Sequence, residues 1–135
     1  VRRVAKLGIS PNFHFTGFLK GEDVKNMFAY SDVYVMPSVS EPFGISPLEA
    51  MRANVPTIIS KQSGVAEVLH HAIKVDFWDV NALADAIYGL LTWPALSAIT
   101  VRCGFEEVNA LKWDNAALKV REIYESVTRE KSKIQ

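Results

Sequence analysis

The sequence predicts an α/β fold in which a parallel sheet is covered by helices on both faces. Short apolar segments alternate with helical patterns through the first part of the 135-residue chain. Strands that alternate with helices are expected to pair in parallel, because each helix carries the chain back across one face of the sheet. The segment 33–36 is also apolar without a break, which is typical of a strand that is covered on both faces.

Four segments are predicted as strands. The first, 13–15, places Phe13, His14 and Phe15 before a turn at Gly17. His14 alternates with the two phenylalanines, so we interpret it as a residue on a face of the sheet rather than as a base. The other three predicted strands are the apolar segments 33–36, 56–60 and 73–75.

Helical spacing of apolar side chains predicts the remaining elements. Pro94 separates the first two of three helices that follow Asp79, and Asp114 is a candidate N-cap of the last one. That last helix carries an apolar stripe made of Ala116, Val120, Ile123 and Val127. The earlier helical segments are 2–8, 21–30, 46–53 and a short turn at 66–70.

Composition excludes several classes of function. The 15 Lys and Arg residues balance the 15 Asp and Glu residues, so the basic field typical of a nucleic-acid-binding protein is absent. The single cysteine, Cys103, excludes an intrachain disulfide and a multi-cysteine zinc site. His70 and His71 are adjacent, a poor spacing for a metal pair on a helix, so we expect no metal there. No apolar run approaches the roughly 18 residues of a membrane span, so we expect a cytoplasmic protein or one peripheral to a membrane.

The loop after the strand 33–36 contains the main candidate site, because ligands of parallel sheets bind beyond the carboxyl ends of the strands. Gly44 lies at the entry of the helix 46–53, where free backbone N–H groups favour an anion such as phosphate. Glu41 and Glu49 flank this turn, and their carboxylates suit the hydroxyl groups of sugars on either side of a phosphate. A nucleotide sugar, in which a diphosphate joins two sugars, has this shape.

Structural interpretations of the same residues stay open. Ser46, Pro47 and Glu49 also match a capping box, with Ser at the N-cap, Pro at N1 and Glu at N3. Glu41 has an alternative interpretation as a solvated loop carboxylate, and Gly44 as an ordinary turn glycine.

The loop after the strand 56–60 offers a second wall for the same crevice. Ser63 and Gly64 form a strand-to-turn connection there, which is otherwise an ordinary loop with Ser63 capping a short helix. Lys61, at the carboxyl end of the strand, either faces an anion or is solvated.

The segment 31–51 resembles the carboxyl-terminal half of the GT-B glycosyltransferases, and more narrowly glycosyltransferase family 4, the group 1 enzymes. The resemblance rests on residues 31–38, on a Glu-x7-Glu signature at Glu41 and Glu49, and on residues 48–51. Residues 15–19 and 63–67 match further turns of that family, so the match follows nearly the whole chain in order and spacing. Residues 40–44 are spelled as in relatives of the starch and glycogen synthases, which implies a glucosyl donor.

The resemblance implies that residues 1–135 are part of a Rossmann-like, nucleotide-sugar-binding domain with carboxyl-terminal helices. It implies that Glu41 is the catalytic residue, in contact with hydroxyl groups of the donor sugar, and that Glu49 binds the ribose. Backbone amides at 43–45 would approach the sugar and the distal phosphate, and the turn at 17–19 would lie by the nucleobase. The implied donor-binding residues are Glu41, Phe43, Gly44, Ile45, Glu49, Phe18 and Leu19.

The resemblance also implies the reaction and its partners. Such enzymes move a sugar from a nucleoside diphosphate sugar, of the UDP, ADP or GDP type, to an acceptor hydroxyl with retention of configuration. They need no bound metal and no organic cofactor, and their amino-terminal domain binds the acceptor sugar or glycan. An Arg and a Lys that neutralise the diphosphate belong upstream of the strand 13–15. We therefore expect this chain to begin inside a longer protein, to have an exposed sheet edge and to be inactive alone.

Two other interpretations stay open at this point. One is a GT-B nucleotide-sugar epimerase, which the signature formed by Glu41 and Glu49 fits less well. The other is a non-catalytic, flavodoxin-like binding domain. That domain would need an acidic phosphorylation site at the end of a strand, whereas Asp32 precedes its strand.

Overall fold

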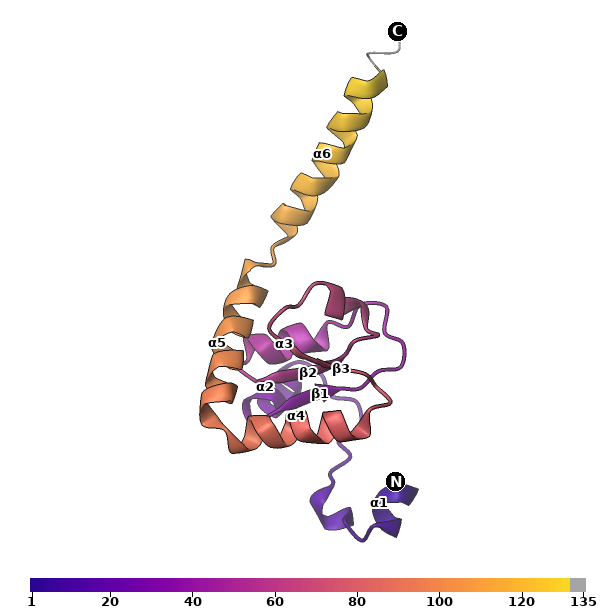
Figure 1. Ribbon diagram of the computed structural model, residues 1–135, viewed down its shortest axis with the longest axis vertical. Coiled ribbons are helices and arrows are strands. Elements are labelled where there is room, and N and C mark those ends of the chain that lie inside the picture. Colours follow the sequence, from indigo (N-terminus) through magenta and orange to yellow (C-terminus); the bar gives the residue numbers. More distant parts are fainter. Residues whose placement is uncertain (132–135) are drawn as a thin grey trace.

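Three short strands form a parallel sheet in the computed structural model, which describes residues 1–131 (Figure 1). They are β1 (Tyr34–Met36), β2 (Thr57–Ser60) and β3 (Ile73–Val75), in the order β1-β2-β3. In the register, Val35 lies opposite Ile58, and Ile59 lies opposite Lys74. The predictions of a parallel sheet and of strands at 33–36, 56–60 and 73–75 are confirmed.

The predicted strand at 13–15 is wrong. Residues 13–15 have no strand partner among residues 1–131, and the side chains of Phe13 and Phe15 are 50% and 64% exposed. The two rings stack at 6.4 Å between centroids, as expected for alternate residues that point to one side of an extended chain. A strand needs hydrogen bonds to a neighbour as well as a suitable sequence, and no neighbour is provided by the described residues.

Helices fill the rest of the described chain, and most lie where the apolar spacing predicts them. Asp79 caps α4, because its carboxylate accepts a hydrogen bond from the Ala82 N–H at 2.9 Å, and Pro94 begins α5. The helices are α1 (Arg2–Lys6), α2 (Glu22–Ala29), α3 (Ser46–Arg52), α4 (Val80–Thr92), α5 (Pro94–Ala110) and α6 (Trp113–Lys131), with short 3₁₀ turns η1 (Ser10–Asn12) and η2 (Gly64–Glu67).

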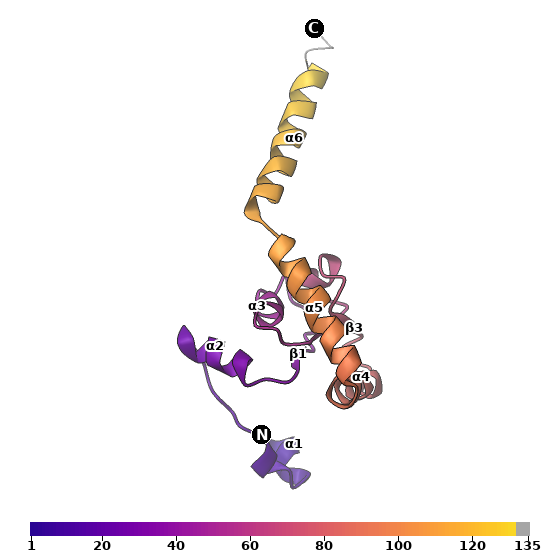
Figure 2. The same cartoon turned by 90° about the vertical axis from the view of Figure 1, so that its left-hand side faces the viewer.

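Apolar cores form on both faces of the sheet. Side chains alternate along a strand, so the fully buried Ile58 and Ile59 enter opposite cores. Ile59 packs with Met51 of α3 and Val108 of α5, whereas Ile58 packs with Leu90 of α4. In Figure 2, α3 and α4 lie on opposite sides of the strands, which confirms the prediction of helices on both faces.

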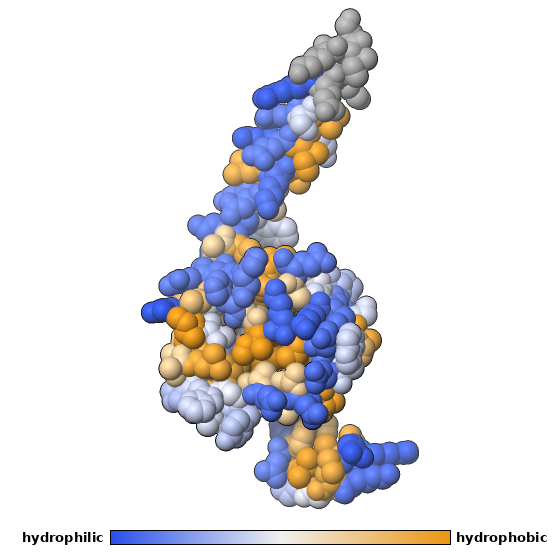
Figure 3. Space-filling view, in the orientation of Figure 1, coloured by the Kyte–Doolittle hydropathy of each residue, from blue (hydrophilic) through white to orange (hydrophobic). Residues whose placement is uncertain are grey.

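Helix α6 projects away from the sheet and its covering helices (Figures 1 and 2). Its apolar stripe is uncovered, since Val120, Ile123 and Val127 are 50%, 61% and 47% exposed. Figure 3 shows apolar side chains on this helix between hydrophilic ones. Asp114 lies inside the first turn rather than at the predicted N-cap, because the helix already begins at Trp113.

No single helix within residues 1–131 is long and apolar enough to cross a membrane. Helices α4 and α5 meet the length and composition requirement only when they are joined across a bend of 98°.

Candidate functional site

The loops that follow β1 and β2 lie side by side at the carboxyl edge of the sheet. The Gly64 N–H donates a hydrogen bond to the Glu41 carbonyl at 2.9 Å, and the Val65 N–H donates one to the Phe43 carbonyl at 2.9 Å. Glu41 and Ser63 form an isolated parallel bridge between the same two loops. The structure therefore brings together the two segments that the sequence analysis interprets as walls of one crevice.

Gly64 permits this close contact between the loops. A Cβ atom at position 64 would lie 2.0 Å from the Pro42 carbonyl oxygen, a backbone atom that cannot rotate away. Any larger residue would force the two loops apart, so the glycine is needed for close approach of one backbone to the other.

Gly44 shapes the turn that carries the first carboxylate. Its φ of +88° favours glycine, and a Cβ there would lie 3.1 Å from the Glu41 Cγ and 3.1 Å from the Met36 Cε. The Glu41 side chain thus lies against the turn at Gly44, with Met36 beneath it at the end of β1. Gly44 is therefore required both by its backbone conformation and by the close packing of Glu41 and Met36, whereas an ordinary turn glycine is required by its conformation alone.

The turn leaves three backbone donors available. The N–H groups of Phe43, Gly44 and Ile45 donate to no acceptor within residues 1–131, and the side chains of Phe43 and Ile45 are 41% and 67% exposed. Helix α3 has only seven residues, so its dipole is small. Hydrogen bonds from these N–H groups would therefore contribute more to the binding of an anion than the helix dipole would.

The capping-box interpretation of Glu49 is wrong in this structure. Ile45 is the N-cap of α3 and has no side-chain cap, so Glu49 does not stand at N3. The Ser46 hydroxyl pairs instead with the Tyr34 hydroxyl at 2.7 Å. Glu49 is exposed on the first turns of α3, where its carboxylate is accessible to a ligand.

Tyr34 of β1 is influenced by both acidic residues. Burial raises the pKa of Tyr34 above its ordinary value, the hydrogen bond with Ser46 opposes that shift, and the negative charges of Glu49 and Glu41 raise it further. The charges of Glu41 and Glu49 are thus both within electrostatic reach of the Tyr34 phenol. The pairing of Tyr34 with Ser46 was not predicted, although a hydroxyl group within an otherwise apolar strand signals that it has a polar partner.

Lys61 is paired with a carboxylate, so the structure does not support its role as a free cation facing an anion. Its ammonium donates to Asp76 at 2.9 Å, and the Gln62 amide donates to the other oxygen of the same carboxylate at 2.9 Å. Hydrogen bonds from Lys61 and then from Gln62 hold the pKa of Asp76 below its ordinary value. The loop after β2 is thereby attached to the end of β3.

The turn predicted to lie by a nucleobase is exposed. Gly17 has a φ of +68°, as a turn glycine would, and the Phe18 side chain is 87% exposed with the Lys20 Nζ 5.4 Å from its ring centroid. Leu19 is half-buried. No hydrogen bond or ring contact within the described residues joins Phe18 or Leu19 to the turn at Glu41, so their role stays a prediction.

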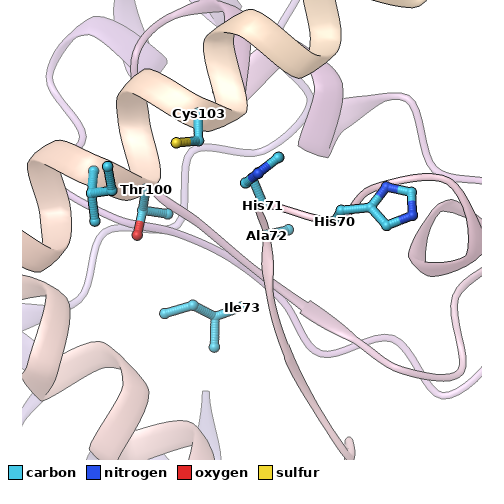
Figure 4. Close-up of a pocket in the computed structure, with 7 residues that line it drawn as sticks. His70, His71, Ala72, Ile73, Thr100 and Cys103 are labelled. Carbon is cyan, nitrogen blue, oxygen red and sulfur yellow. The ribbon is translucent and has the colours of Figure 1, made fainter.

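A shallow cavity of about 220 Å³ lies away from these loops, at the amino end of β3 (Figure 4). Thr100 and Cys103 of α5 line one side of it and the segment 70–73 lines the other. Within residues 1–131, no three His, Cys, Asp or Glu side chains gather closely enough to hold a metal ion. The histidines have another role: the backbone N–H and the Nδ1 of both His70 and His71 contact the Glu107 carboxylate at 2.7–3.2 Å.

Comparison with known proteins identifies the family. The family model described as glycosyl transferases group 1 matches residues 1–101, three quarters of the chain. The chain belongs to the group 1 glycosyltransferases. This group 1 chain is 32% identical, over 124 residues, to an uncharacterized glycosyltransferase of Methanocaldococcus jannaschii, a match that covers 88% of the chain and 32% of that relative.

Solved glycosyltransferase structures share the fold. Sucrose-phosphate synthase from Thermosynechococcus elongatus superposes with a TM-score of 0.78 at 29% identity, over 96% of this chain and 33% of that one. HepE from Anabaena, solved in complex with UDP-glucose, superposes with a TM-score of 0.78 at 20% identity, over 93% of this chain and 35% of that one. The group 1 chain therefore spans about a third of the length of these proteins. The family match supports the GT-B fold and leaves the flavodoxin-like alternative without support.

Proposed function

We propose that the whole protein transfers a sugar from a nucleoside diphosphate sugar to an acceptor hydroxyl with retention of configuration, and that this chain binds the donor. The observation that carries the proposal is that the free N–H groups of 43–45 lie in the chain between Glu41 and the exposed Glu49 at the start of α3. The complex of HepE with UDP-glucose, in a protein of the same fold, supports a nucleotide sugar as the donor class.

Each part of the site has a proposed role that follows from its chemistry. Glu49 accepts hydrogen bonds from the ribose hydroxyls, and Glu41 accepts them from hydroxyls of the donor sugar. The N–H groups at 43–45 donate to oxygens of the distal phosphate, and Phe18 and Leu19 lie beside the base.

The proposed transfer breaks the bond between the anomeric carbon and the diphosphate oxygen and forms a bond from that carbon to the acceptor oxygen. The nucleoside diphosphate leaves with the electron pair of the broken bond, and the proton of the acceptor hydroxyl passes to the departing diphosphate oxygen. The N–H groups at 43–45, which have no acceptor within residues 1–131, stabilise the charge that develops on this leaving group. We assign the acceptor site, and the cationic side chains that complete the diphosphate site, to the rest of the whole protein.

Calorimetry on the full-length protein tests these roles with UDP, ADP and GDP and with UDP-glucose, ADP-glucose and GDP-mannose. Glu49→Ala is expected to weaken binding of the free nucleoside diphosphate and of its sugar derivative alike, by about tenfold or more, because hydrogen bonds to a charged group are lost. Glu41→Gln is expected to weaken only the sugar derivative. Glu106→Gln, an exposed carboxylate on α5, is the matched control.

Unchanged binding in the two variants would overturn the proposal. If both variants bind every nucleotide and nucleotide sugar as the parent does, Glu41 and Glu49 are not donor ligands. If the parent itself binds none of the six compounds, a different substrate class is required.

A further inference from the structure

The Gln62 side chain joins the end of β2 to the segment that follows β3 at the carboxyl edge of the sheet. Its Nε2 donates to the Asp76 Oδ1 at 2.9 Å, just beyond β3. Its Oε1 accepts a hydrogen bond from the Ser60 hydroxyl at 2.8 Å and a longer one from the Phe77 N–H at 3.4 Å. The Gln62 N–H in turn donates to the Ser60 Oγ at 3.1 Å. Both ends of this amide are therefore occupied by groups of this chain.

These contacts fix the loop that follows β2. Ser60 and Ser63 are buried, and the Ser63 hydroxyl donates to the Ser60 carbonyl at 2.7 Å, which closes the turn around Gln62. The Lys61 N–H donates to the Val75 carbonyl at 2.9 Å and continues the ladder with β3. The turn is thus held by its own serines and by the end of β3.

The same loop supports the backbone of the proposed donor-sugar ligand. Gly64 and Val65 follow directly and donate to the carbonyls of Glu41 and Phe43, at 2.9 Å each. On its other side the turn at Gly44 is anchored to α3, because the Ile45 carbonyl accepts hydrogen bonds from the Leu48 and Glu49 N–H groups at 2.9 and 3.2 Å, so the β2 loop holds the Glu41 side of the turn. A displacement of the β2 loop would therefore be passed directly to Glu41.

We propose that Gln62 is a positioning residue for the donor-sugar site: it ties the β2 loop to Asp76, and the amides of Gly64 and Val65 hold Glu41 in place. This inference rests on the proposed function only for the ligand that Glu41 contacts. The structural part of the inference, the mechanical part, is that Gln62 keeps the backbone of residues 63–65 well ordered. It depends only on the hydrogen bonds described above.

Lys61 provides a matched control next to Gln62. Its ammonium contacts the same Asp76 carboxylate, but its side chain is 52% exposed and forms no hydrogen bond with Ser60 or Phe77 in the part of the chain that the structure describes. Lys61→Met therefore removes a solvated ion pair and leaves the turn closed, whereas Gln62→Met keeps a similar length and removes all of its side-chain hydrogen bonds.

Amide hydrogen exchange in the ligand-free, full-length protein tests the mechanical part. Gln62→Met is expected to raise the exchange rates of the Gly64 and Val65 amides by about tenfold or more, since about one net hydrogen bond of local stability is lost. Lys61→Met is expected to leave them unchanged. Gln62→Glu keeps the acceptor for Ser60 and repels Asp76, so its exchange rates should lie between those of the parent and Gln62→Met. Equal rates in the parent and Gln62→Met would overturn the inference.

A double-mutant cycle with Glu41→Gln tests the positioning of the ligand. Gln62→Met alone should weaken nucleotide-sugar binding by about tenfold and binding of the free nucleoside diphosphate by clearly less, because Glu49 keeps its place on α3 while the turn at 43–45 loosens. In the Glu41→Gln background, Gln62→Met should have little further effect. Additive effects, or equal losses for nucleotide and nucleotide sugar, would contradict positioning through Glu41. If the parent binds no nucleotide sugar, the proposed function fails while the exchange rates still decide the role of Gln62.

Discussion

Gly64 and Gly104 both lie where an added Cβ would meet another atom, but the neighbouring atoms differ in kind. At Gly64 that atom is a backbone oxygen of Pro42 at 2.0 Å, whereas at Gly104 it is the Cε of Met51 at 2.8 Å, the end of a flexible side chain. Gly64 lies where two loops are joined by backbone hydrogen bonds, whereas Gly104 of α5 packs against a side chain of α3 that can move. The two glycines therefore differ in their tolerance of substitution.

We predict that Gly64→Ala lowers the free energy of unfolding by about 2 kcal/mol or more, because two inter-loop hydrogen bonds, each worth about 1 kcal/mol, are lost. Gly104→Ala should cost less, since Met51 can shift and alanine favours a helix over glycine by about 1 kcal/mol. Urea denaturation of the 135-residue chain, followed by circular dichroism, measures both values. Equal losses for the two variants would contradict the steric explanation.

Single residues become candidates for a site where their own chemistry is unusual in the sequence. Glu41, Gly44 and Glu49 stand out by spacing, by a glycine before a helix and by two carboxylates around it. The pairing of Tyr34 with Ser46 was not predictable, because either hydroxyl has several partners within reach until the tertiary structure selects one. The sequence pattern of a capping box at Ser46 was misleading for the same reason.

At the scale of elements, α5 is attached to the segment before β3 by one carboxylate. Partial burial would raise the pKa of Glu107, but hydrogen bonds from the backbone amides of His71 and His70, and then from their imidazoles, hold it below its ordinary value. The Glu107 side chain is only 11% exposed, so these bonds are partly shielded from water.

We predict that Glu107→Gln lowers the free energy of unfolding by about 1–3 kcal/mol at pH 7, since charge-assisted hydrogen bonds are replaced by weaker ones. A carboxyl pKa that is lowered by folding stabilises the fold above its ordinary value of 4.5 and loses that effect as the pH falls through the folded-state pKa. The gap between parent and variant should therefore shrink below about pH 4.5. Urea denaturation across pH 3–7 measures the gap, with the exposed Glu106→Gln as control; a gap that is independent of pH would contradict this assignment.

Elements were predictable where local pattern and tertiary structure agree. The segments 33–36, 56–60 and 73–75 are apolar and short, and each finds a parallel neighbour. The segment 13–15 has an equally good strand pattern but no neighbour within the described residues, so a strand does not form there. The spacing of apolar side chains indicates which residues prefer burial. It does not indicate whether a neighbouring strand is available for pairing.

The whole molecule combines a covered sheet with two projecting parts. Helix α6 extends from one end, the amino-terminal segment lies at the other, and both carry exposed apolar side chains (Figures 1 and 3). The chain spans about a third of the length of the glycosyltransferases it matches. Our proposal places the donor site on this chain and assigns the acceptor site to the rest of the whole protein.

The central claim is that Glu41 and Glu49 face one nucleotide sugar across the turn at 43–45. A crystal structure of the full-length protein with whichever of UDP-glucose, ADP-glucose or GDP-mannose binds in calorimetry tests it most directly. We predict that the Glu49 carboxylate lies within about 3 Å of the ribose hydroxyls and the Glu41 carboxylate within about 3 Å of a donor-sugar hydroxyl. A donor bound elsewhere, or at this edge with both carboxylates turned away from it, would contradict the account.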